Sequence, residues 1–439
     1  MTNINIEIER EFAKLEPDKD WSFKDVTASE TNHLTHSYHR YPAKFIPNIV
    51  RKLIEDYTTT DNIVCDPFGG CGTTLVEAKL MGRKSIGFDI NPIAKLITQT
   101  KITPLPPKRL SKTFENFKQN LPNQKSIVLQ HNEKIFYWFD ETTIHELDKL
   151  YSAIKKISDF ETRRLFLCAF SHILKNCSKW LMKSIKPTID KDKIIPSPEE
   201  VFIQHMQRMV KKNELFSSTL KEKKLLAVNS KMRLGDSTKK LPLKEESIDL
   251  VITSPPYVTS YEYADLHQLS LLWFGDDPSY FKRWNKYAKD YNFFRSKFVG
   301  TRHKKEKRGD YGSEIAKSII EELAVKNKRI ALNVSNYFID MKKSFEQIHR
   351  VLKKRGKACI IIGNTSLRGV PINNAQVAAE QMKKTGFKKI EFIKREISSK
   401  VITSWRDVEN GRFTSLKNSN KRKIYDYEYI LIMEKQASA

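Results

Sequence analysis

The chain has 439 residues, which is more than one typical domain needs and enough to bury a substantial core. Hydrophobic residues make up 39% of it and charged residues 30%, a balance that excludes a disordered chain and predicts a globular protein with a wide polar surface. A formal net charge of +26 favours a polyanionic partner such as nucleic acid, although solvated basic faces on a lysine-rich chain produce the same excess.

No run of about 18 apolar residues occurs, and no basic segment precedes an apolar one at the N-terminus, so a cytoplasmic protein without a membrane span is expected. The 5 cysteines lie far apart and lack metal-ligand spacing, which predicts reduced thiols and no metal site. Residues 1–35 are polar and mixed and predict little. Residues 36–47 form a basic, aromatic loop, after which apolar residues at helical spacing predict a helix from Pro47 to Tyr57.

A glycine-rich turn follows the first predicted strand, residues 63–65, and precedes a helix at residues 75–81. Its notable residues are Asp66, Phe68, Gly69, Gly70, Gly72 and Thr73. The glycines let the backbone approach a ligand closely, and the helix N-terminus adds unpaired N–H groups. The next strand, residues 84–89, ends in Asp89, 17 positions after Gly72, where a carboxylate can bind a ribose diol. The turn and the acid together predict an adenosine-containing cofactor.

The glycine pattern also distinguishes between cofactors. A dinucleotide site would have G-x-G-x-x-G, and a phosphate loop would have Lys-Ser or Lys-Thr after its last glycine. The chain has neither pattern, which favours a ligand without phosphates. Asp66 offers a carboxylate for an ammonium group. S-adenosylmethionine carries adenosine, an amino acid end and a sulfonium, and is therefore the predicted cofactor.

The strand–helix alternation stops near residue 100 and resumes near residue 230. Pro104 to Pro107 mark the boundary, and three stretches with helical periodicity follow, at residues 142–157, 161–183 and 198–226. We expect residues 101–229 to form a large helical insertion, a possible target-recognition region. Its many lysines face either DNA or solvent.

Two more strands are predicted after the insertion. A short one from residue 231 ends at Asp236, whose carboxylate either accepts a hydrogen bond from an adenine amino group or caps a turn. The second, residues 248–252, stops abruptly at Thr253-Ser254-Pro255-Pro256-Tyr257, because proline offers no N–H to a sheet. Ligands bind at the carboxyl edge of such sheets, so this motif is predicted to lie in the site.

These motifs resemble those of the amino-methylating DNA methyltransferases, the family that modifies N4 of cytosine or N6 of adenine. The segment from Tyr41 to Pro47 is similar to the one that closes over the methionine end of the cofactor in that family. The resemblance implies an α/β fold: a Rossmann-like class I S-adenosylmethionine-dependent methyltransferase sheet built from residues 1–100 and 230–439. It implies these cofactor-binding residues: Lys44, Phe45, Asp66, Phe68, Gly69, Gly70, Gly72, Thr73, Asp89, Ile90 and Asp236.

The chemistry of amine methylation explains the motif independently. The exocyclic amine of cytosine is a poor nucleophile because its lone pair is drawn into the ring. The side chain of Ser254 and the carbonyl of Pro255, held rigid by Pro256, can accept the two N–H bonds and localise that lone pair. Tyr257 can stack on a base flipped out of the duplex. These four residues are the predicted catalytic residues, and no covalent nucleophile is needed.

Ser-Pro-Pro-Tyr, rather than Asp-Pro-Pro-Tyr, is the form most typical of the N4-cytosine enzymes of the resembling family. The resemblance therefore implies a cytosine-N4 DNA methyltransferase acting on double-stranded DNA, related to restriction–modification, with a possible cognate restriction endonuclease. Adenine N6 in DNA, a base amine in RNA, and a non-catalytic nucleic-acid binder are the alternatives. The sequence indicates neither the recognition sequence nor the oligomeric state.

Basic residues alternate with aromatic ones between residues 282 and 308, a mixture suited to phosphate neutralisation and base stacking. Helices at 338–352 and 375–384, the latter stopped by Gly386, and strands at 357–363, 387–397 and 425–434 complete the chain, the last two as an antiparallel pair. Their long connection, residues 398–424, is a second DNA-contact candidate. The predicted nucleic-acid contacts are Lys282, Arg283, Lys286, Arg295, Lys297, Arg302, Lys304, Lys305, Arg406 and Arg412.

Overall fold

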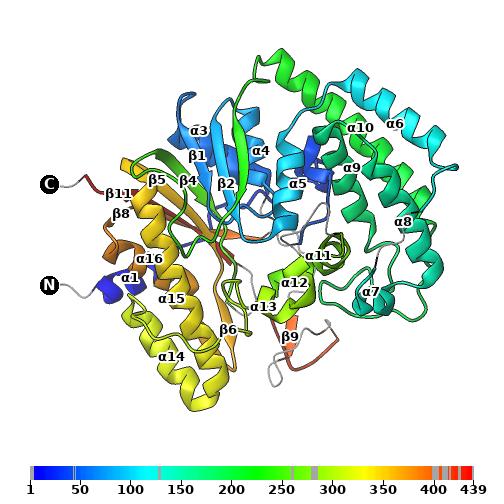
Figure 1. The fold of residues 1–439 in the computed structure, drawn as a ribbon. Coiled ribbons are helices and arrows are strands. Elements are labelled where there is room, and N and C mark those ends of the chain that lie inside the picture. The colour runs from blue at the N-terminus through cyan, green and yellow to red at the C-terminus, as the bar shows by residue number, and fades with distance from the viewer. Residues whose placement is uncertain are drawn as a thin grey trace.

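The structure is a computed structural model that describes residues 4–42, 44, 46–126, 130–258, 262–277, 285–397, 405–407, 414, 417–423 and 427–437. A seven-stranded sheet forms its centre, with the strand order β3-β2-β1-β4-β5-β11-β8 (Figure 1). Its strands are β1 (Ile63–Asp66), β2 (Lys84–Asp89), β3 (Ser230–Leu234), β4 (Ile248–Thr253), β5 (Leu352–Ile362), β8 (Phe387–Glu396) and β11 (Tyr427–Lys435).

The first five strands of this sheet are parallel, and β11 runs antiparallel to both β5 and β8. The predicted antiparallel pair at the end of the sheet is thus confirmed. Strand order reverses between β1 and β4, which are neighbours in space although residues 67–247 separate them in sequence. Such a reversal opens a crevice at the carboxyl edge, where open α/β sheets bind ligands. Asp66 and Thr253 end the two strands that flank it.

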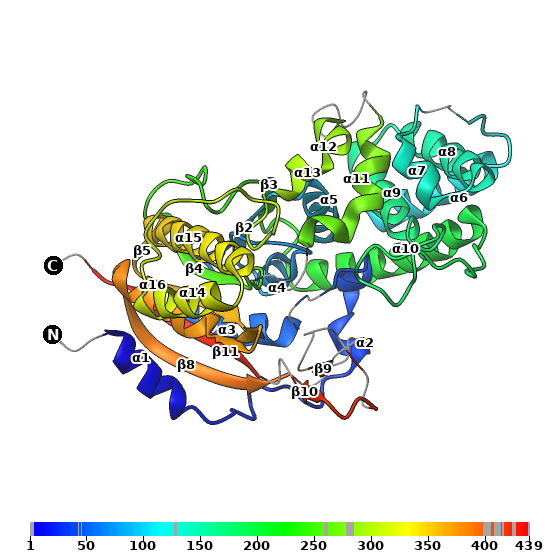
Figure 2. The same ribbon diagram turned by 90° about the horizontal axis from the view of Figure 1, so that it is seen from below.

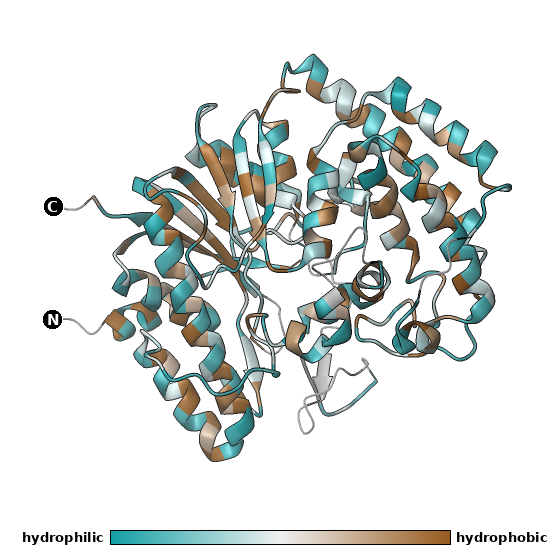
Figure 3. Ribbon diagram, viewed as in Figure 1, coloured by the Kyte–Doolittle hydropathy of each residue, from teal (hydrophilic) through white to brown (hydrophobic). Residues whose placement is uncertain are grey.

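Helices cover both faces of the sheet. On one face, α3 (Pro47–Tyr57) buries Ile49 and Leu53 against strand residues such as Leu250. The other face carries α1 (Ile4–Ala13), α14 (Glu314–Lys326), α15 (Lys328–Val351) and α16 (Asn374–Lys384). Figure 3 shows apolar residues along the central strands and along the inner sides of these helices. The arrangement confirms the predicted α/β fold with a Rossmann-like sheet.

A helical lobe lies to one side of the sheet (Figures 1 and 2). Its helices are α6 (Pro107–Asn120), α7 (Glu133–Trp138), α8 (Glu141–Lys155), α9 (Phe160–Ile173) and α10 (Pro198–Glu222). The prediction of one helix over residues 161–183 was wrong at its end, because α9 stops at Ile173 and the chain then turns until Trp180 bridges Ile189. Helices α6 and α7 were not predicted from the sequence, and neither was α5 (Pro92–Ile102), which connects β2 to the lobe.

The lobe shares its core with the segment that follows the Ser-Pro-Pro-Tyr motif. The elements of that segment are η2 (Tyr263–His267), α11 (Gln268–Gly275), α12 (Asn285–Lys289) and α13 (Tyr291–Arg295). His131 precedes α7. Its Nε2 lies 3.0 Å from Oδ1 of Asp148 in α8, and its Nδ1 lies 3.5 Å from Oδ2 of Asp276 at the end of α11. Burial lowers the pKa of His131, but the two carboxylates outweigh burial and raise it to about 9. A charged histidine therefore joins this segment to the lobe. The division into a core and an insertion at residues 101–229 stays a prediction.

Short elements complete the described chain. They are α2 (Ala28–Thr31), η1 (Leu34–Ser37), α4 (Thr73–Leu80) and the hairpins β6 (Thr365–Leu367) with β7 (Val370–Ile372) and β9 (Trp405–Asp407) with β10 (Lys421–Lys423). Across the part of the chain that the structure describes, no helix has both the length and the apolar character needed to span a bilayer.

Candidate active site

The glycine-rich turn closes tightly between β1 and α4. The amide of Gly69 donates to the Phe88 carbonyl at 2.8 Å, which holds the turn beside β2. Gly70 and Gly72 have φ angles of +48° and +79°, in the left-handed region that favours glycine. A Cβ on Gly72 would lie 2.4 Å from the Thr98 side chain. The conformation and the packing both require glycine here, and the turn brings backbone amides to the crevice.

Asp66 joins the glycine-rich turn to the Ser-Pro-Pro-Tyr motif. Its Oδ1 accepts hydrogen bonds from Thr253 Oγ1 at 2.6 Å and from the Phe68 amide at 3.1 Å. Its Oδ2 accepts one from Thr74 Oγ1 at 2.8 Å. The residue is 1% exposed, and burial raises the pKa of its carboxyl to about 6 even though these hydrogen bonds act in the opposite direction. Asp66 was predicted to pair with an ammonium group of the cofactor. The structure shows that it also holds the glycine-rich turn and the end of β4 together.

Asp89 is half-buried at the end of β2, where a ligand can reach it. Its Oδ2 accepts from the Gly70 amide at 2.9 Å, and its Oδ1 accepts from the Asn91 amide at 2.7 Å. The Ile90 amide also donates to this carboxylate, so three of its roughly four acceptor sites are occupied and one more hydrogen bond can be accepted. Burial raises the pKa of Asp89 to about 6. The geometry fits a carboxylate that organises the turn and binds a ribose diol.

Replacing Asp89 with asparagine is expected to weaken S-adenosylmethionine binding by roughly ten-fold near pH 7.5, because the new amide group would face the amide of either Gly70 or Asn91. In the unmodified protein, affinity is expected to fall as the pH drops through about 6, where the carboxylate takes up a proton. Isothermal titration calorimetry across this range measures both effects. An unchanged pH profile in Asp89→Asn would contradict the role of Asp89.

Cofactor affinity is expected to fall as the pH drops, whereas the contribution of the Asp66 and Asp89 carboxyl groups to folding stability is expected to rise. The folded-state pKa values of Asp66 and Asp89 are raised from 3.8 to about 6, so between these values the folded chain holds more protons than the unfolded chain. These two groups therefore stabilise the fold at low pH, and their contribution is lost as the pH rises through about 6. Thermal unfolding across this range separates stability from cofactor affinity.

Asp236 lies beyond β3 on the same edge. The Gly235 amide donates to the Asp89 carbonyl at 3.0 Å, which places the two acidic residues beside each other. Asp236 Oδ1 accepts from the amide and the hydroxyl of Thr238 at 3.0 and 2.7 Å, so the turn-capping role weighed from the sequence is observed. Its Oδ2 is 3.8 Å from the Lys239 ammonium group, too far for a hydrogen bond. That oxygen stays suited to an amino group of a ligand.

The Ser-Pro-Pro-Tyr motif is partly exposed to solvent, and its tyrosine is held by a hydrogen bond to β11. Ser254 and Pro256 are half-buried, and Pro255 is buried. The Tyr257 hydroxyl donates to Glu428 Oε1 at 2.6 Å. Burial raises the pKa of Tyr257 well above its usual value, and the nearby Glu428 adds to the rise, so the ring stays neutral.

Two glycines let other segments close around Tyr257. A Cβ on Gly363, just beyond β5, would lie 3.2 Å from the ring edge of Tyr257. Gly300 has a φ of +78°, and a Cβ on it would lie 3.2 Å from the Tyr257 carbonyl oxygen. Residues after α13 therefore pack directly against the motif.

The remaining predicted cofactor residues surround the turn. Thr73 is buried at the start of α4, and Phe68 and Ile90 are half-buried. Lys44 donates to Asn32 Oδ1 at 2.7 Å, and burial lowers its pKa. Phe45 lies outside the described residues. Tyr41, the first residue of the segment predicted to close over the methionine end of the cofactor, also lies at the turn, where a Cβ on Gly70 would be 3.3 Å from its hydroxyl.

Three of the predicted nucleic-acid contacts are held in ion pairs within the protein. Arg295 donates from Nε and Nη2 to Asp265, at 2.8 and 3.0 Å, and Arg302 lies 3.1 Å from Glu262. Lys304 lies 2.5 Å from Asp340, with only 10% of its side chain exposed. These partners come from neighbouring elements, which the local sequence does not reveal. The three residues therefore tie the segment after the motif to its surroundings.

Other predicted contacts stay accessible in the described part of the chain. The ammonium groups of Lys286 and Lys297 lie 4.9 and 4.3 Å from the centroid of the Phe293 ring, which is 37% exposed. The ammonium group of Lys297 lies within electrostatic reach of Asp236. Lys305 is exposed. Lys282, Arg283 and Arg412, together with the side chain of Arg406 on β9, lie outside the described residues.

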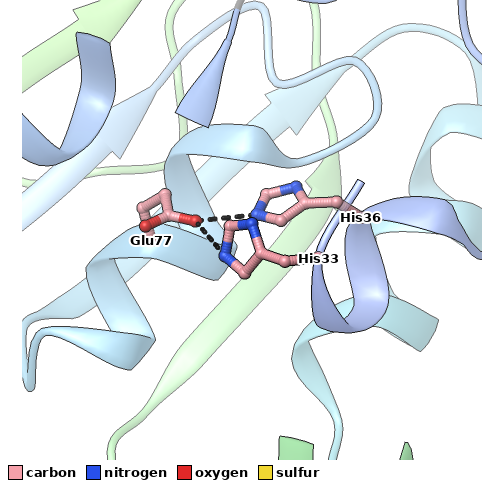
Figure 4. Close-up of side chains that lie close together, drawn as sticks. All are labelled: His33, His36 and Glu77. Atoms are coloured by element: carbon pink, nitrogen blue, oxygen red, sulfur yellow. Dashed lines mark hydrogen bonds and ion pairs between the residues drawn. The ribbon is translucent and has the colours of Figure 1, made fainter. Parts of the chain in front are cut away.

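A compact cluster of side chains connects residues 4–42, which we call the N-terminal arm, to α4 (Figure 4). His36 Nε2 and His33 Nε2 lie 2.8 and 3.3 Å from Glu77 Oε1, while Arg51 donates to Glu77 Oε2 at 3.1 Å. Burial lowers the pKa of His36 to about 4, so its neutral ring donates to the carboxylate. Both oxygens of Glu77 thus have protein partners. We interpret the cluster as a structural connection that holds the arm beside the glycine-rich turn.

Comparisons with known proteins find both sequence relatives and solved structures that are similar to this chain. The DNA methylase family model N6_N4_Mtase matches residues 4–100. Type II methyltransferase M.MvaI of Kocuria varians is 25% identical, covering 92% of this chain and 91% of its own length. Type II methyltransferase M.BsoBI of Geobacillus stearothermophilus is 24% identical, covering 82% and 80%. Among solved structures, the rRNA methyltransferase AviRa from Streptomyces viridochromogenes aligns with 93% of each chain at 9% identity and a TM-score of 0.32.

The strand order and the acidic carboxyl edge define a Rossmann-like methyltransferase fold of class I, and this assignment rests on the sheet itself. Within that class, the chain is similar over most of its length to type II methyltransferases, and its residues 4–100 match the DNA methylase family model. The resemblance predicted from the motifs is thus confirmed.

Proposed function

We propose that this protein transfers a methyl group from S-adenosylmethionine to the exocyclic N4 amine of a flipped cytosine in duplex DNA. The hydrogen bond between Asp66 and Thr253 carries the proposal, because it connects a cofactor-type turn to an amine-binding motif across the switch point of the sheet. The type II methyltransferases similar to this chain support a DNA substrate and a link to restriction–modification. A cognate endonuclease is part of the proposal.

The chain's residues supply binding and orientation. Asp89, Asp236 and the amides of the glycine-rich turn would hold the cofactor, which provides an electrophilic methyl group when bound. Ser254 and the Pro255 carbonyl accept hydrogen bonds from the target amine and direct its lone pair. Because the amine becomes strongly acidic only once methylated, proton loss follows the transfer and no strong base is required. Holding the reacting atoms in line supplies much of the remaining rate.

Cytosine is favoured over adenine by Ser254 at the first position of the motif, and adenine N6 is the second candidate. Incubation with tritiated S-adenosylmethionine and either duplex DNA or RNA tests the reaction class. Mass analysis of the methylated nucleosides then identifies the base, with N4-methylcytosine expected. Label in RNA alone, or in neither polymer while DNA binding is intact, would overturn the proposal.

DNA contacts are proposed at two lysines, the exposed Lys286 on α12 and the half-buried Lys297 after α13. Lys286 and Lys297 flank the exposed ring of Phe293, and this mixture suits phosphate neutralisation beside base stacking. The ion-paired Arg295 is assigned no phosphate contact, because Asp265 already neutralises it.

Lys286→Gln and Lys297→Gln are each expected to lower DNA affinity and to reduce the slope of log affinity against log salt by about 0.9, the value for one phosphate contact. Fluorescence anisotropy over a series of salt concentrations measures this slope. Lys354→Gln removes one charge from an exposed position near the amino end of β5, away from the site, and serves as the matched control. Equal slopes in all three variants would show that Lys286 and Lys297 contact no phosphate.

A further inference from the structure

A chain of hydrogen bonds runs from Tyr257 across the end of the sheet. Its hydroxyl donates to Glu428 Oε1 at 2.6 Å, and Arg395 Nη1 donates to Glu428 Oε2 at 2.6 Å. Arg395 Nε then donates to the Trp21 carbonyl at 2.8 Å, and its Nη2 donates to the Ser22 carbonyl at 3.3 Å. We call these connected groups the Tyr257 relay. It begins at a predicted catalytic side chain and ends on the backbone of the N-terminal arm.

The sheet brings these residues together from distant parts of the chain. Glu428 and Arg395 are directly opposed in the antiparallel pairing of β11 with β8. Since β11 runs antiparallel to β5, its first residues lie at the edge where β4 and β5 end. Tyr257 follows β4 at that edge, and its ring rests against Gly363 just beyond β5. The relay therefore spans four neighbouring strands on the side of the sheet that holds the site.

Arg395 and Glu428 are both buried, so their charges must be neutralised within the protein. Arg395 is 4% exposed and Glu428 is 9% exposed, so each charge depends on the other and on its hydrogen-bond partners. Both oxygens of Glu428 are engaged, one by Tyr257 and one by Arg395. A hydrogen bond at the far end of a tyrosine ring fixes the position of the hydroxyl and so prevents rotation about Cα–Cβ. Rotation about Cβ–Cγ leaves the hydroxyl oxygen in place, and here the close approach of Gly363 to the ring edge restricts that second rotation. A hydrogen bond to a charged acceptor is stronger than one between neutral groups.

We propose that Glu428 and Arg395 are positioning residues that hold the ring of Tyr257 in the place needed to stack on the flipped base. This inference rests on the proposed function and deepens it. The carboxylate of Glu428 orients the ring through its hydroxyl. Arg395 neutralises that carboxylate and ties it to the N-terminal arm. The protein therefore presents the ring in a fixed orientation before DNA arrives, which spares the cost of ordering it during binding.

Glu428→Gln and Tyr257→Phe test the relay, because each preserves shape while weakening the central hydrogen bond. Each is expected to lower turnover on DNA on the order of ten-fold while leaving the dissociation constant for S-adenosylmethionine within about two-fold of that of the unmodified protein. The double variant is expected to be no slower than the slower single variant, because both changes remove the same interaction. Losses that multiply in the double variant, or full turnover in Glu428→Gln, would overturn the proposal.

Tyr151→Phe is the matched control. The Tyr151 hydroxyl also donates to a carboxylate, Asp277 Oδ2 at 2.8 Å, but in the core of the helical lobe. Its loss is expected to lower the melting temperature and leave turnover unchanged. A similar loss of turnover in Tyr151→Phe would show that general destabilisation explains the relay variants.

A spectroscopic measurement separates failure of this inference from failure of the proposed function. The chain is labelled with 3-fluorotyrosine, and the fluorine resonance of residue 257 is assigned by its absence in Tyr257→Phe. In the DNA-free protein, Glu428→Gln is expected to shift and broaden that resonance, since the ring gains freedom. An unchanged resonance would overturn the relay even if the protein methylates DNA. A shifted resonance in a protein that methylates no nucleic acid would overturn the proposed function, and with it the stacking role, while confirming the relay contact.

Discussion

Replacing Tyr257 with alanine is expected to lower kcat by roughly 10- to 100-fold, because a base stacked on an aromatic side chain is stabilised by about 1–3 kcal/mol. The dissociation constant for S-adenosylmethionine is expected to change little, since the predicted cofactor contacts come from the other strands. Methyl transfer to duplex DNA under saturating cofactor measures the first quantity, and calorimetry measures the second. Tyr257→Phe keeps the ring, so its expected loss, on the order of ten-fold, lies at the lower end of this range.

Tyr257→Ala also affects Glu428, the residue that accepts the hydrogen bond from the Tyr257 hydroxyl. Without the hydroxyl, Glu428 Oε1 loses the hydrogen bond that it receives at 2.6 Å. Tyr257→Ala should therefore also lower the melting temperature slightly, because a buried acceptor without a partner is unfavourable. Cofactor affinity falling in parallel with kcat would contradict the role of Tyr257 as a base-stacking residue and would place it in the cofactor pocket.

Asp66→Ala is expected to have the largest effect on the integrity of the site. The substitution removes the acceptor used by Thr253 Oγ1, Thr74 Oγ1 and the Phe68 amide. Each buried donor left without a partner costs about 1–3 kcal/mol, although Thr74 Oγ1 has a second acceptor, the Ile252 carbonyl, at 3.4 Å. A loss of about 2–3 kcal/mol in the free energy of unfolding and of most cofactor binding is expected.

Chemical denaturation and calorimetry measure these two losses, and Asp249→Ala is the matched control. Asp249 lies at the opposite end of β4, where its Oδ2 accepts from the Ile63 amide at 2.8 Å and its Oδ1 pairs with Lys353 at 2.7 Å. Its removal is expected to reduce stability while leaving cofactor affinity unchanged. If Asp66→Ala retained full cofactor affinity, the carboxylate would have no part in organising the site.

The sequence predicted the catalytic half of the fold well because its signals are local. Apolar, β-branched runs that end in glycine or proline predicted β1, β2 and β4 close to their observed bounds. Parallel pairing then places their carboxyl ends together, which is why Asp66 and Asp89 were expected at one edge before any contact was known. Helix α6 was missed although Leu110, Phe114 and Phe117 have helical spacing, and α7 was missed because 6 residues are too few for a periodic signal.

Ion pairing was the feature that the local sequence did not reveal. Arg295 and Arg302 belong to a basic, aromatic stretch and stay predicted DNA contacts, and the structure adds a carboxylate partner for each. Their partners lie about 30 to 40 residues earlier in the chain, so no local pattern signals the pairing. Lys286 and Lys297 come from the same stretch and stay on the surface.

The sequence by itself determined the class of chemistry, because glycine, acidic and Ser-Pro-Pro-Tyr signals are carried by consecutive residues whose backbone and side chains constrain one another. Only the tertiary structure decided how these parts are joined. The Asp66–Thr253 hydrogen bond spans 187 residues, and the Tyr257–Glu428 hydrogen bond spans 171. Contacts of that separation arise from strand order and register, which depend on the packing of the whole sheet and leave no periodic trace in the chain.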